Sequence, residues 1–174
     1  VRLTRSLLPT LIARRGAIVN ISSIQARLTL RGFFPYAAAK SGLEGLTRSL
    51  ALEYASAGVR VNAVAPGYTD TRLVQEWLSL QDDPTATLAA VHANIPLGRM
   101  AEPREIGSAV VFLLSDQASA ITGEVLAVYG GTGARFAPAP SPGRAGLPPA
   151  TPPPSRRHPR GTPPPPPGVR RPLR

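Results

Sequence analysis

Tyr36 and Lys40 lie four positions apart, a spacing that places two side chains on the same face of a helix. A phenol ionises at about pH 10, which is too high for efficient proton transfer at neutral pH, but a neighbouring ammonium favours the phenolate. The pair therefore predicts a tyrosine that can exchange a proton with a substrate. Such pairs are also common by chance, so the alternative is a tyrosine at a helix start and a lysine on the surface.

Ser23 and the dipeptide Pro66-Gly67 each follow an apolar segment that predicts a buried parallel strand, at residues 17–21 and 59–65. Ligands of a parallel sheet bind outside the carboxyl ends of its strands, where these residues are expected to lie. A hydroxyl at that edge can bind a substrate oxygen, whereas the alternative is a serine that only forms part of a turn. With the tyrosine–lysine pair, three features converge on one edge of one sheet.

The elements that must position these residues alternate between helix and strand. In chain order, the pattern predicts a helix over residues 2–14, a strand over 17–21, a loop over 23–35, a helix over 36–57, a strand over 59–65, helical pieces around 71–80 and 85–93, a helix over 103–114 and a strand over 124–128. This alternation predicts an α/β fold in which helices cover a parallel sheet. Three strands make a thin sheet, which indicates that part of the parent fold is missing.

Composition divides the chain into a domain over residues 1–134 and a tail over residues 135–174. The tail holds 15 of the 21 prolines, 8 of the 20 Lys and Arg residues and none of the 10 Asp and Glu residues. Proline cannot donate a backbone hydrogen bond, and few large apolar residues are present to form a core, so we expect the tail to be disordered. The net charge of +10 therefore belongs mostly to the tail, and a nucleic-acid-binding role would rest on the tail alone.

Several other classes of protein are not expected. The chain has no cysteine, which excludes disulfides and thiolate metal sites, and its two histidines, His92 and His158, are isolated. No segment approaches the roughly 20 apolar residues of a membrane span. We therefore expect a cytoplasmic protein that binds neither a metal nor a membrane.

Four segments together resemble the short-chain dehydrogenases/reductases of the classical type. They are GAIVNISS at residues 16–23, YAAAKSG at 36–42, RVNAVAPG at 60–67 and GEVLAVYGG at 123–131. Their order and spacing match the family over about residues 1–134. The resemblance implies a Rossmann-like, doubly wound parallel sheet that is truncated, because the N-terminal cofactor-binding half is missing.

The resemblance also implies a role for individual residues. Tyr36 would be the acid–base group, Lys40 would assist it and bind the nicotinamide ribose, and Ser23 would hold the substrate oxygen. Further residues expected beside the cofactor are Pro66, Gly67, Thr69 and Thr71, and those expected beside the substrate are Gln25 and Tyr68. Residues 70–98 resemble the variable substrate loop, whose apolar members either cap a pocket or form the core of small helices; these are Leu73, Val74, Trp77 and Leu78.

The departures from the family concern the cofactor more than the chemistry. The glycine-rich turn that holds the pyrophosphate, the Asn-Ala-Gly segment and the catalytic asparagine of the family have no counterpart in the chain. The residue that selects NAD or NADP is missing as well, so either cofactor is expected. Tyr129 replaces the aspartate that usually precedes Gly130-Gly131. These glycines are not a substitute phosphate-binding loop, because prolines rather than a helix follow them.

The sequence thus predicts a fragment of an NAD(P)-dependent oxidoreductase that interconverts a secondary alcohol and a ketone. The segments resemble 3-oxoacyl carrier-protein reductases as much as sugar or polyol dehydrogenases. The expected partners are a small-molecule substrate and, in the full-length family, further copies in a dimer or tetramer. The alternative is a non-catalytic remnant, or a pairing partner of a complete paralogue, which would bind neither reduced cofactor.

Overall fold

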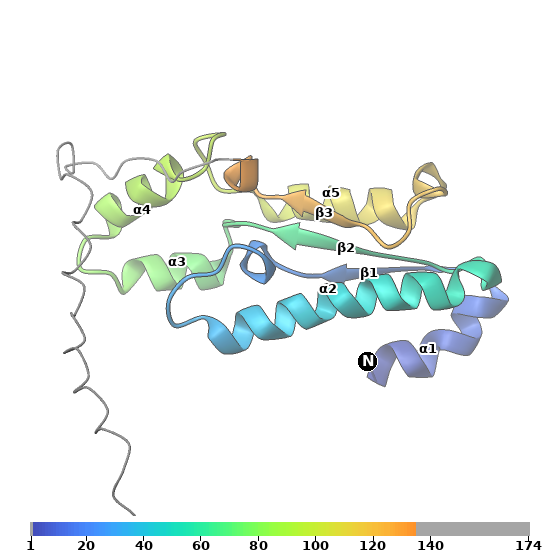
Figure 1. The fold of residues 1–174 in the computed structure, drawn as a ribbon. Helices are drawn as coiled ribbons and strands as arrows, with labels where there is room; N and C mark the ends of the chain where they lie inside the picture. The colour runs from blue at the N-terminus through green and yellow to red at the C-terminus, as the bar shows by residue number, and fades with distance from the viewer. Residues whose placement is uncertain (1, 135–174) are drawn as a thin grey trace, which may run out of the picture.

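A three-stranded parallel sheet in the order β1-β2-β3 forms the centre of the computed structural model, which describes residues 2–134 (Figure 1). The strands are β1 (Ala17–Ile21), β2 (Arg60–Pro66) and β3 (Val125–Val128). Ile18 lies opposite Val61 in one pair of strands, and Ala63 lies opposite Val125 in the other. The middle strand β2 is buried over most of its length, as its apolar sequence predicts. The expected disordered tail lies outside the described residues.

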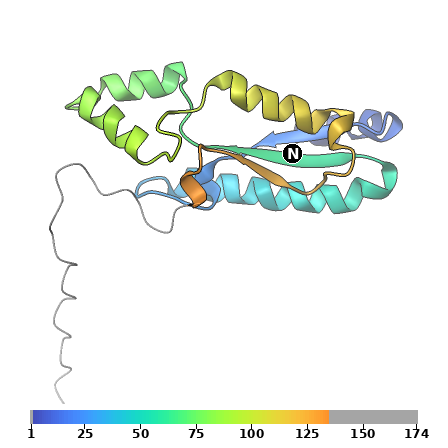
Figure 2. The same cartoon turned by 90° about the horizontal axis from the view of Figure 1, so that it is seen from above.

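Helices cover both faces of this sheet (Figure 2). On one face, Val61 packs in a cluster with Ala51 of α2 (Phe34–Tyr54); on the other, Val64 packs with Leu113 of α5 (Pro103–Leu114). Both connections step in the same direction across the sheet, so helices on opposite faces require crossovers of opposite hand. One of them therefore departs from the usual right-handed rule. The doubly wound, Rossmann-like α/β fold that the sequence predicts is confirmed.

The remaining elements lie around the two ends of the sheet. The α-helices are α1 (Arg2–Ala13), α3 (Arg72–Ser79) and α4 (Pro84–Ala93), and the short 3-10 turns are η1 (Ile24–Ala26), η2 (Ala55–Ala57), η3 (Asp116–Ala118) and η4 (Thr132–Ala134). Helices α3 and α4 lie beyond the carboxyl ends of the strands (Figure 1). They share a small apolar cluster that includes Leu78, Val91 and Ile95. Within residues 2–134, no helix has the length and apolarity to cross a membrane.

The structure corrects three details of the predicted elements. Helix α2 begins at Phe34 rather than Tyr36, because Pro35 is accommodated in its first turn. The last residues of the predicted helix form η2, which ends at Gly58 with a left-handed φ of 77°. The predicted loop over residues 23–35 contains the turn η1, which Ser23 caps. These differences shift boundaries without changing the order of the elements.

The start of α5 is held by an ion pair. Glu105 accepts hydrogen bonds from both terminal guanidinium nitrogens of Arg99, at 2.8 and 2.7 Å, and from the backbone N–H of Glu102 at 2.8 Å. These interactions favour the carboxylate, and the hydrogen bonds from Arg99 contribute most to lowering the pKa of Glu105 to about 2. Folding is therefore linked to the ionisation of this side chain.

We expect Glu105→Gln to lower the melting temperature at pH 7, because it removes the carboxylate that the folded state favours. A lowered folded-state pKa gives stability that is complete above the ordinary value of 4.5 and is lost as the pH falls towards about 2. The difference in melting temperature between the variant and the parent should thus shrink below pH 4.5. Circular dichroism melts across this pH range measure it, with the exposed Glu53→Gln as control. A difference that is independent of pH would contradict the linkage.

Candidate active site

A cavity of about 470 Å³ opens at the carboxyl end of the sheet, between η1, the start of α2 and the segment that follows β2. Its volume lies within the range of small-molecule sites. The residues that line it are Ser23, Ile24, Gln25, Phe33, Tyr36, Gly67, Tyr68, Thr69, Thr71, Leu73 and Val74. The structure therefore brings together seven of the residues predicted from the sequence. Lys40 and Pro66 do not line the cavity; Pro66 pairs with Val128 at the end of β2.

Ser23 is held at the end of β1 with its hydroxyl group in a defined role. Its backbone is extended, and its Oγ accepts a hydrogen bond of 3.2 Å from the backbone N–H of Gln25. Because the oxygen accepts here, its own proton can be donated to another group in the cavity. Gln25 is fixed as well, since its Oε1 accepts a hydrogen bond from the backbone N–H of Leu30. The amide NH₂ group of Gln25 is then the end of the side chain that is left for a ligand.

Tyr36 and Lys40 lie close together on the first turns of α2. The Lys40 ammonium lies 5.5 Å from the centroid of the Tyr36 ring, within range of a cation–π interaction. The same Nζ donates a hydrogen bond of 2.7 Å to the carbonyl of Ile21, the last residue of β1. The lysine thus bridges the strand that leads to Ser23 and the helix that carries Tyr36.

The segment after β2 is fixed against the loop before α5. Thr69 forms a parallel bridge with Ala101, and the backbone N–H of Ala101 donates to the carbonyl of Tyr68 at 3.0 Å. Thr71 caps α3, since its Oγ1 accepts from the backbone N–H of Val74. The wall of the cavity that carries Tyr68, Thr69 and Thr71 therefore has backbone support and does not depend on side-chain packing alone.

The apolar residues of the expected substrate loop divide between the two interpretations. Leu73 and Val74 line the cavity, whereas Leu78 is buried in the cluster between α3 and α4. Trp77 stacks on Tyr68, with ring centroids 6.5 Å apart. Ile24 and Phe33 also line the cavity, although the sequence did not predict either of them there. The aromatic pair Phe33-Phe34, just before Pro35 and Tyr36, is the sequence feature that could have indicated Phe33.

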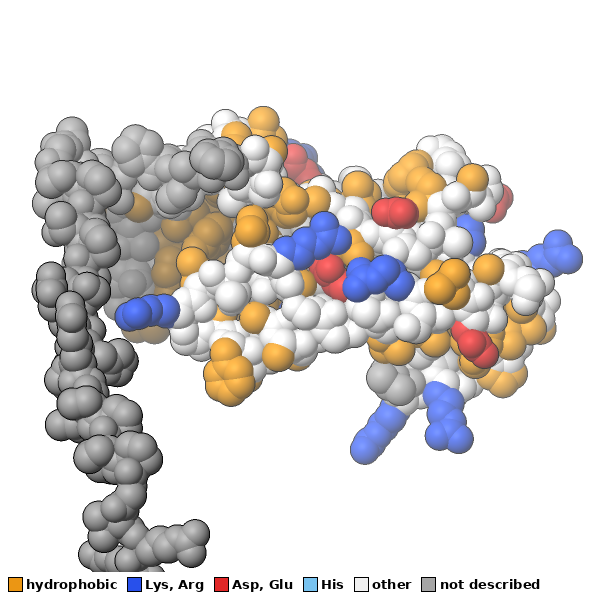
Figure 3. All heavy atoms as spheres, viewed as in Figure 1, with side chains coloured by type: hydrophobic (Ala, Val, Ile, Leu, Met, Phe, Trp, Pro, Cys, Tyr) orange, Lys and Arg blue, Asp and Glu red, His pale blue; other side chains and the backbone are white. Residues whose placement is uncertain are grey.

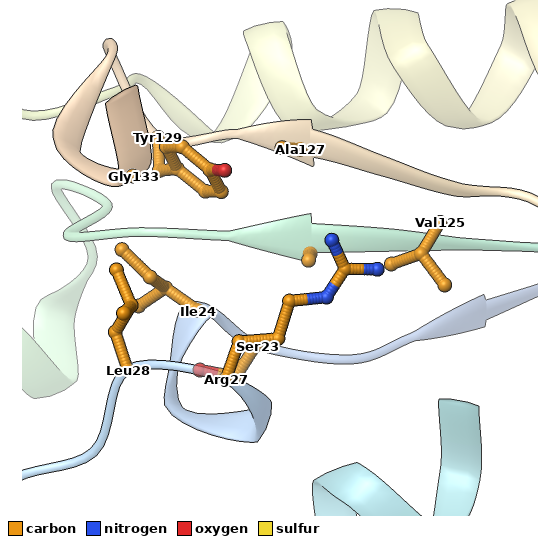
Figure 4. A pocket seen from close by; sticks show the side chains of 9 residues that line it. Ser23, Ile24, Arg27, Leu28, Val125, Ala127, Tyr129 and Gly133 are labelled. Atoms are coloured by element: carbon orange, nitrogen blue, oxygen red, sulfur yellow. The ribbon is translucent and has the colours of Figure 1, made fainter. Parts of the chain in front are cut away.

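A second, smaller cavity of about 160 Å³ adjoins the first and shares Ser23 and Ile24 with it (Figure 4). Arg27 and Tyr129 point into it from opposite sides. Tyr129 also explains the glycine at position 67, because a Cβ atom there would lie 2.5 Å from the Cβ of Tyr129. The described residues contain no group of three His, Asp or Glu side chains that could hold a metal ion.

Glu44 is a buried carboxylate that the sequence analysis also missed. Only 4% of its surface is exposed, and it accepts hydrogen bonds from Ser22 Oγ at 3.0 Å and from Arg27 Nε at 3.2 Å. One turn earlier in α2, Ser41 Oγ donates to the carbonyl of Ala26. Its spacing could have indicated its position, because Glu44 lies four residues after Lys40, as Lys40 lies four residues after Tyr36. These contacts attach the Ser23 segment to the helix of the predicted acid–base residue.

Comparison with known proteins identifies the family of the chain. A family model described as enoyl-(acyl carrier protein) reductase matches residues 1–133. The chain belongs to the short-chain dehydrogenase/reductase family. Within this family, it is 50% identical over 119 residues to a cis-4-hydroxycyclohexanecarboxylate dehydrogenase of Sinomonas cyclohexanicum, covering 68% of this chain and 45% of that protein. It is 45% identical over 131 residues to the 3-oxoacyl-[acyl-carrier-protein] reductase FabG of Vibrio harveyi, covering 75% and 51%.

Solved structures of short-chain dehydrogenases agree with the fold. An aldohexose dehydrogenase of Thermoplasma acidophilum is 38% identical and superposes with a TM-score of 0.73, over 80% of this chain and 56% of that one. The Cj0485 dehydrogenase is 35% identical with a TM-score of 0.72, over 74% and 50%. The chain spans about half the length of the curated relatives it matches.

We expect Glu44→Ala to lower the free energy of unfolding by about 1–3 kcal/mol, because it leaves the buried hydroxyl of Ser22 with only its long 3.5 Å contact to the carbonyl of Lys40 and removes the carboxylate that holds Arg27. Glu44→Gln keeps an acceptor for Ser22 and should cost less. Urea unfolding of the two variants measures the difference. Two variants as stable as the parent would show that these contacts do not hold the segment.

Proposed function

We propose that this site interconverts a secondary alcohol and a ketone with NAD or NADP as the cofactor. The observation that carries the proposal is the meeting of Ser23 and Tyr36 in one cavity, with the ammonium of Lys40 beside the tyrosine ring. Two hydroxyl groups that face one cavity can bind the same substrate oxygen. Assembly into a dimer or tetramer and a location in the cytoplasm stay predictions from the sequence.

The residues present fit the nicotinamide end of the cofactor. Gly67, Thr69 and Thr71 line the cavity. Thr71 Oγ1 accepts from a backbone N–H and can still donate its proton, and Thr69 Oγ1 donates to the carbonyl of Gly67 and can still accept, so the two hydroxyl groups can bond a carboxamide. When bound, the nicotinamide would supply to the carbonyl carbon, or accept from it, one hydrogen with two electrons. The sequence contains no glycine-rich turn for the pyrophosphate.

The residues of the chain would handle the oxygen of the substrate. In the direction of reduction, Ser23 donates a hydrogen bond to the carbonyl oxygen while Tyr36 transfers its phenolic proton to the same oxygen. This oxygen becomes the hydroxyl of the alcohol, provided that the carbon has gained one hydrogen and two electrons. The phenolate that remains is next to the ammonium of Lys40 and is reprotonated from water. In the direction of oxidation, the phenolate takes the alcohol proton and the same contacts operate in reverse.

The relatives suggest two kinds of substrate for the proposal. One relative is named for a 3-oxoacyl group on a carrier protein, and another for a hydroxycyclohexanecarboxylate. Both names describe a carbonyl or alcohol on a largely apolar skeleton. We favour the 3-oxoacyl type because its reacting end carries no charge, like the residues that line the cavity.

The test is the Tyr36→Phe variant of the 174-residue chain. It removes the proton donor and keeps the ring, so kcat for the reduction of a ketone or 3-oxoacyl thioester should fall by about 10²–10⁴-fold. Tyr54→Phe removes a hydroxyl outside the cavity and should leave kcat unchanged. The consumption of NADH and NADPH is followed by absorbance, and cofactor binding by titration calorimetry. A parent chain that binds neither cofactor would instead support the non-catalytic alternative.

A further inference from the structure

No side chain that lines the larger cavity carries a formal charge at neutral pH. Its polar groups are the hydroxyls of serine, threonine and tyrosine and one amide, and its other walls are the aliphatic and aromatic side chains of Ile24, Phe33, Leu73 and Val74. Figure 3 shows apolar side chains gathered at this end of the molecule, in the hollow above the start of α2. A ligand that enters the cavity therefore loses contacts with water and gains contacts with uncharged side chains.

Three charged side chains close in sequence to the lining residues are engaged with other groups. Asp70 accepts a hydrogen bond from the side chain of Gln75, and Arg72 forms an ion pair with Glu76 at 2.7 Å. Arg27 points into the smaller cavity and pairs with a buried glutamate. None of these three residues lines the larger cavity. The Lys40 ammonium beside Tyr36 does not line the larger cavity either, and it donates to the carbonyl of Ile21. A carboxylate or phosphate inside the cavity would give up hydration without meeting a charged lining side chain, which is costly.

Aromatic rings stand on two sides of the cavity. Phe33 meets Tyr36 edge to face, with centroids 6.5 Å apart and planes at 78°. Trp77, which does not itself line the cavity, stacks on the lining residue Tyr68 at 29°. Leu73 also lines the cavity, although 74% of its surface is exposed. An apolar ligand that covers this leucine removes apolar surface from water, which is favourable.

We propose that the cavity selects uncharged, apolar ketones and secondary alcohols and excludes those that carry a carboxylate or phosphate next to the reacting ring or chain. This inference rests on the proposed function for its chemistry, because Ser23 and Tyr36 bind the oxygen of the ligand. The proposed selectivity rests on the uncharged walls of the cavity alone. Binding measurements therefore test the selectivity, and turnover measurements test the reaction.

Trp77 allows binding to be measured without turnover. It is the single tryptophan of the chain, and it stacks on a residue that lines the cavity, so its fluorescence reports on occupation. The probes are 4-methylcyclohexanone and 4-oxocyclohexanecarboxylate, which share a ring and a carbonyl and differ in a methyl group against a carboxylate. We expect the methyl ketone to bind at least about tenfold more tightly, because a tenfold ratio corresponds to only about 1.4 kcal/mol of unpaired desolvation.

Two leucine variants locate the binding site. Leu73→Ala removes an apolar wall and should weaken binding of the methyl ketone several-fold, whereas Leu80→Ala, which changes an exposed leucine outside the cavity, should not. Ligand-observed NMR checks the fluorescence result for the parent and both variants. Equal or tighter binding of the carboxylate, equal effects of the two variants, or no saturable binding of either probe would each overturn the proposal.

The failure of selectivity and the failure of catalysis are distinguishable. If the methyl ketone binds preferentially and Leu73→Ala weakens it, but no reduction occurs with NADH or NADPH, the selectivity stands and the proposed reaction is wrong for this chain. If both probes are reduced with the same kcat/KM and the same affinity, the reaction stands and the proposed selectivity is wrong.

Discussion

The site depends on how the segment after β1 is attached to helix α2. Lys40 donates to the end of the strand, Ser41 donates to the carbonyl of Ala26, and Glu44 accepts from Ser22 and Arg27. These contacts lie along one side of the helix and fix a segment that would otherwise be a surface loop. Ser23 lies inside that segment, and the proposed proton donor lies in the first turn of the helix. Their common cavity is therefore a consequence of these few polar contacts.

The topology of the sheet places the opposite wall of the cavity. Because α2 and α5 cover opposite faces, the chain must cross the carboxyl end of the sheet between β2 and α5. Helices α3 and α4 occupy this crossing, and the bridge between Thr69 and Ala101 fixes where it starts and ends. The apolar residues of α3 face two different neighbours. Leu78 packs in the cluster with α4, whereas Leu73 lines the cavity. Because the cluster of α3 and α4 is separate from the clusters that pack on the sheet, substitutions in this wall of the cavity can change its shape without disturbing the sheet.

The sequence predicted the elements because local rules govern them. Apolar β-branched runs, a glycine at a left-handed helix end and a proline in a first turn are each decided by nearby residues. Resemblance to the family supplied the residues that line the cavity. Phe33 and Glu44 escaped prediction, because their positions depend on contacts between distant segments. The carboxylate of Glu44 is bonded by Ser22 and Arg27, which lie 22 and 17 residues away.

The pairing of Glu44 with Arg27 also has a consequence for Lys40. Tyr36, Lys40 and Glu44 follow one another at steps of four residues, so the glutamate could have paired with the lysine along the helix. With the lysine on the N-terminal side, such a pair has the less favourable order. Arg27 and Ser22 satisfy the carboxylate instead, and the lysine ammonium bonds the end of β1 beside the tyrosine ring. The Glu44 side chain, two turns from the proposed proton donor, is thus paired with Arg27, which lies outside the larger cavity, and the Lys40 ammonium stays beside the Tyr36 ring.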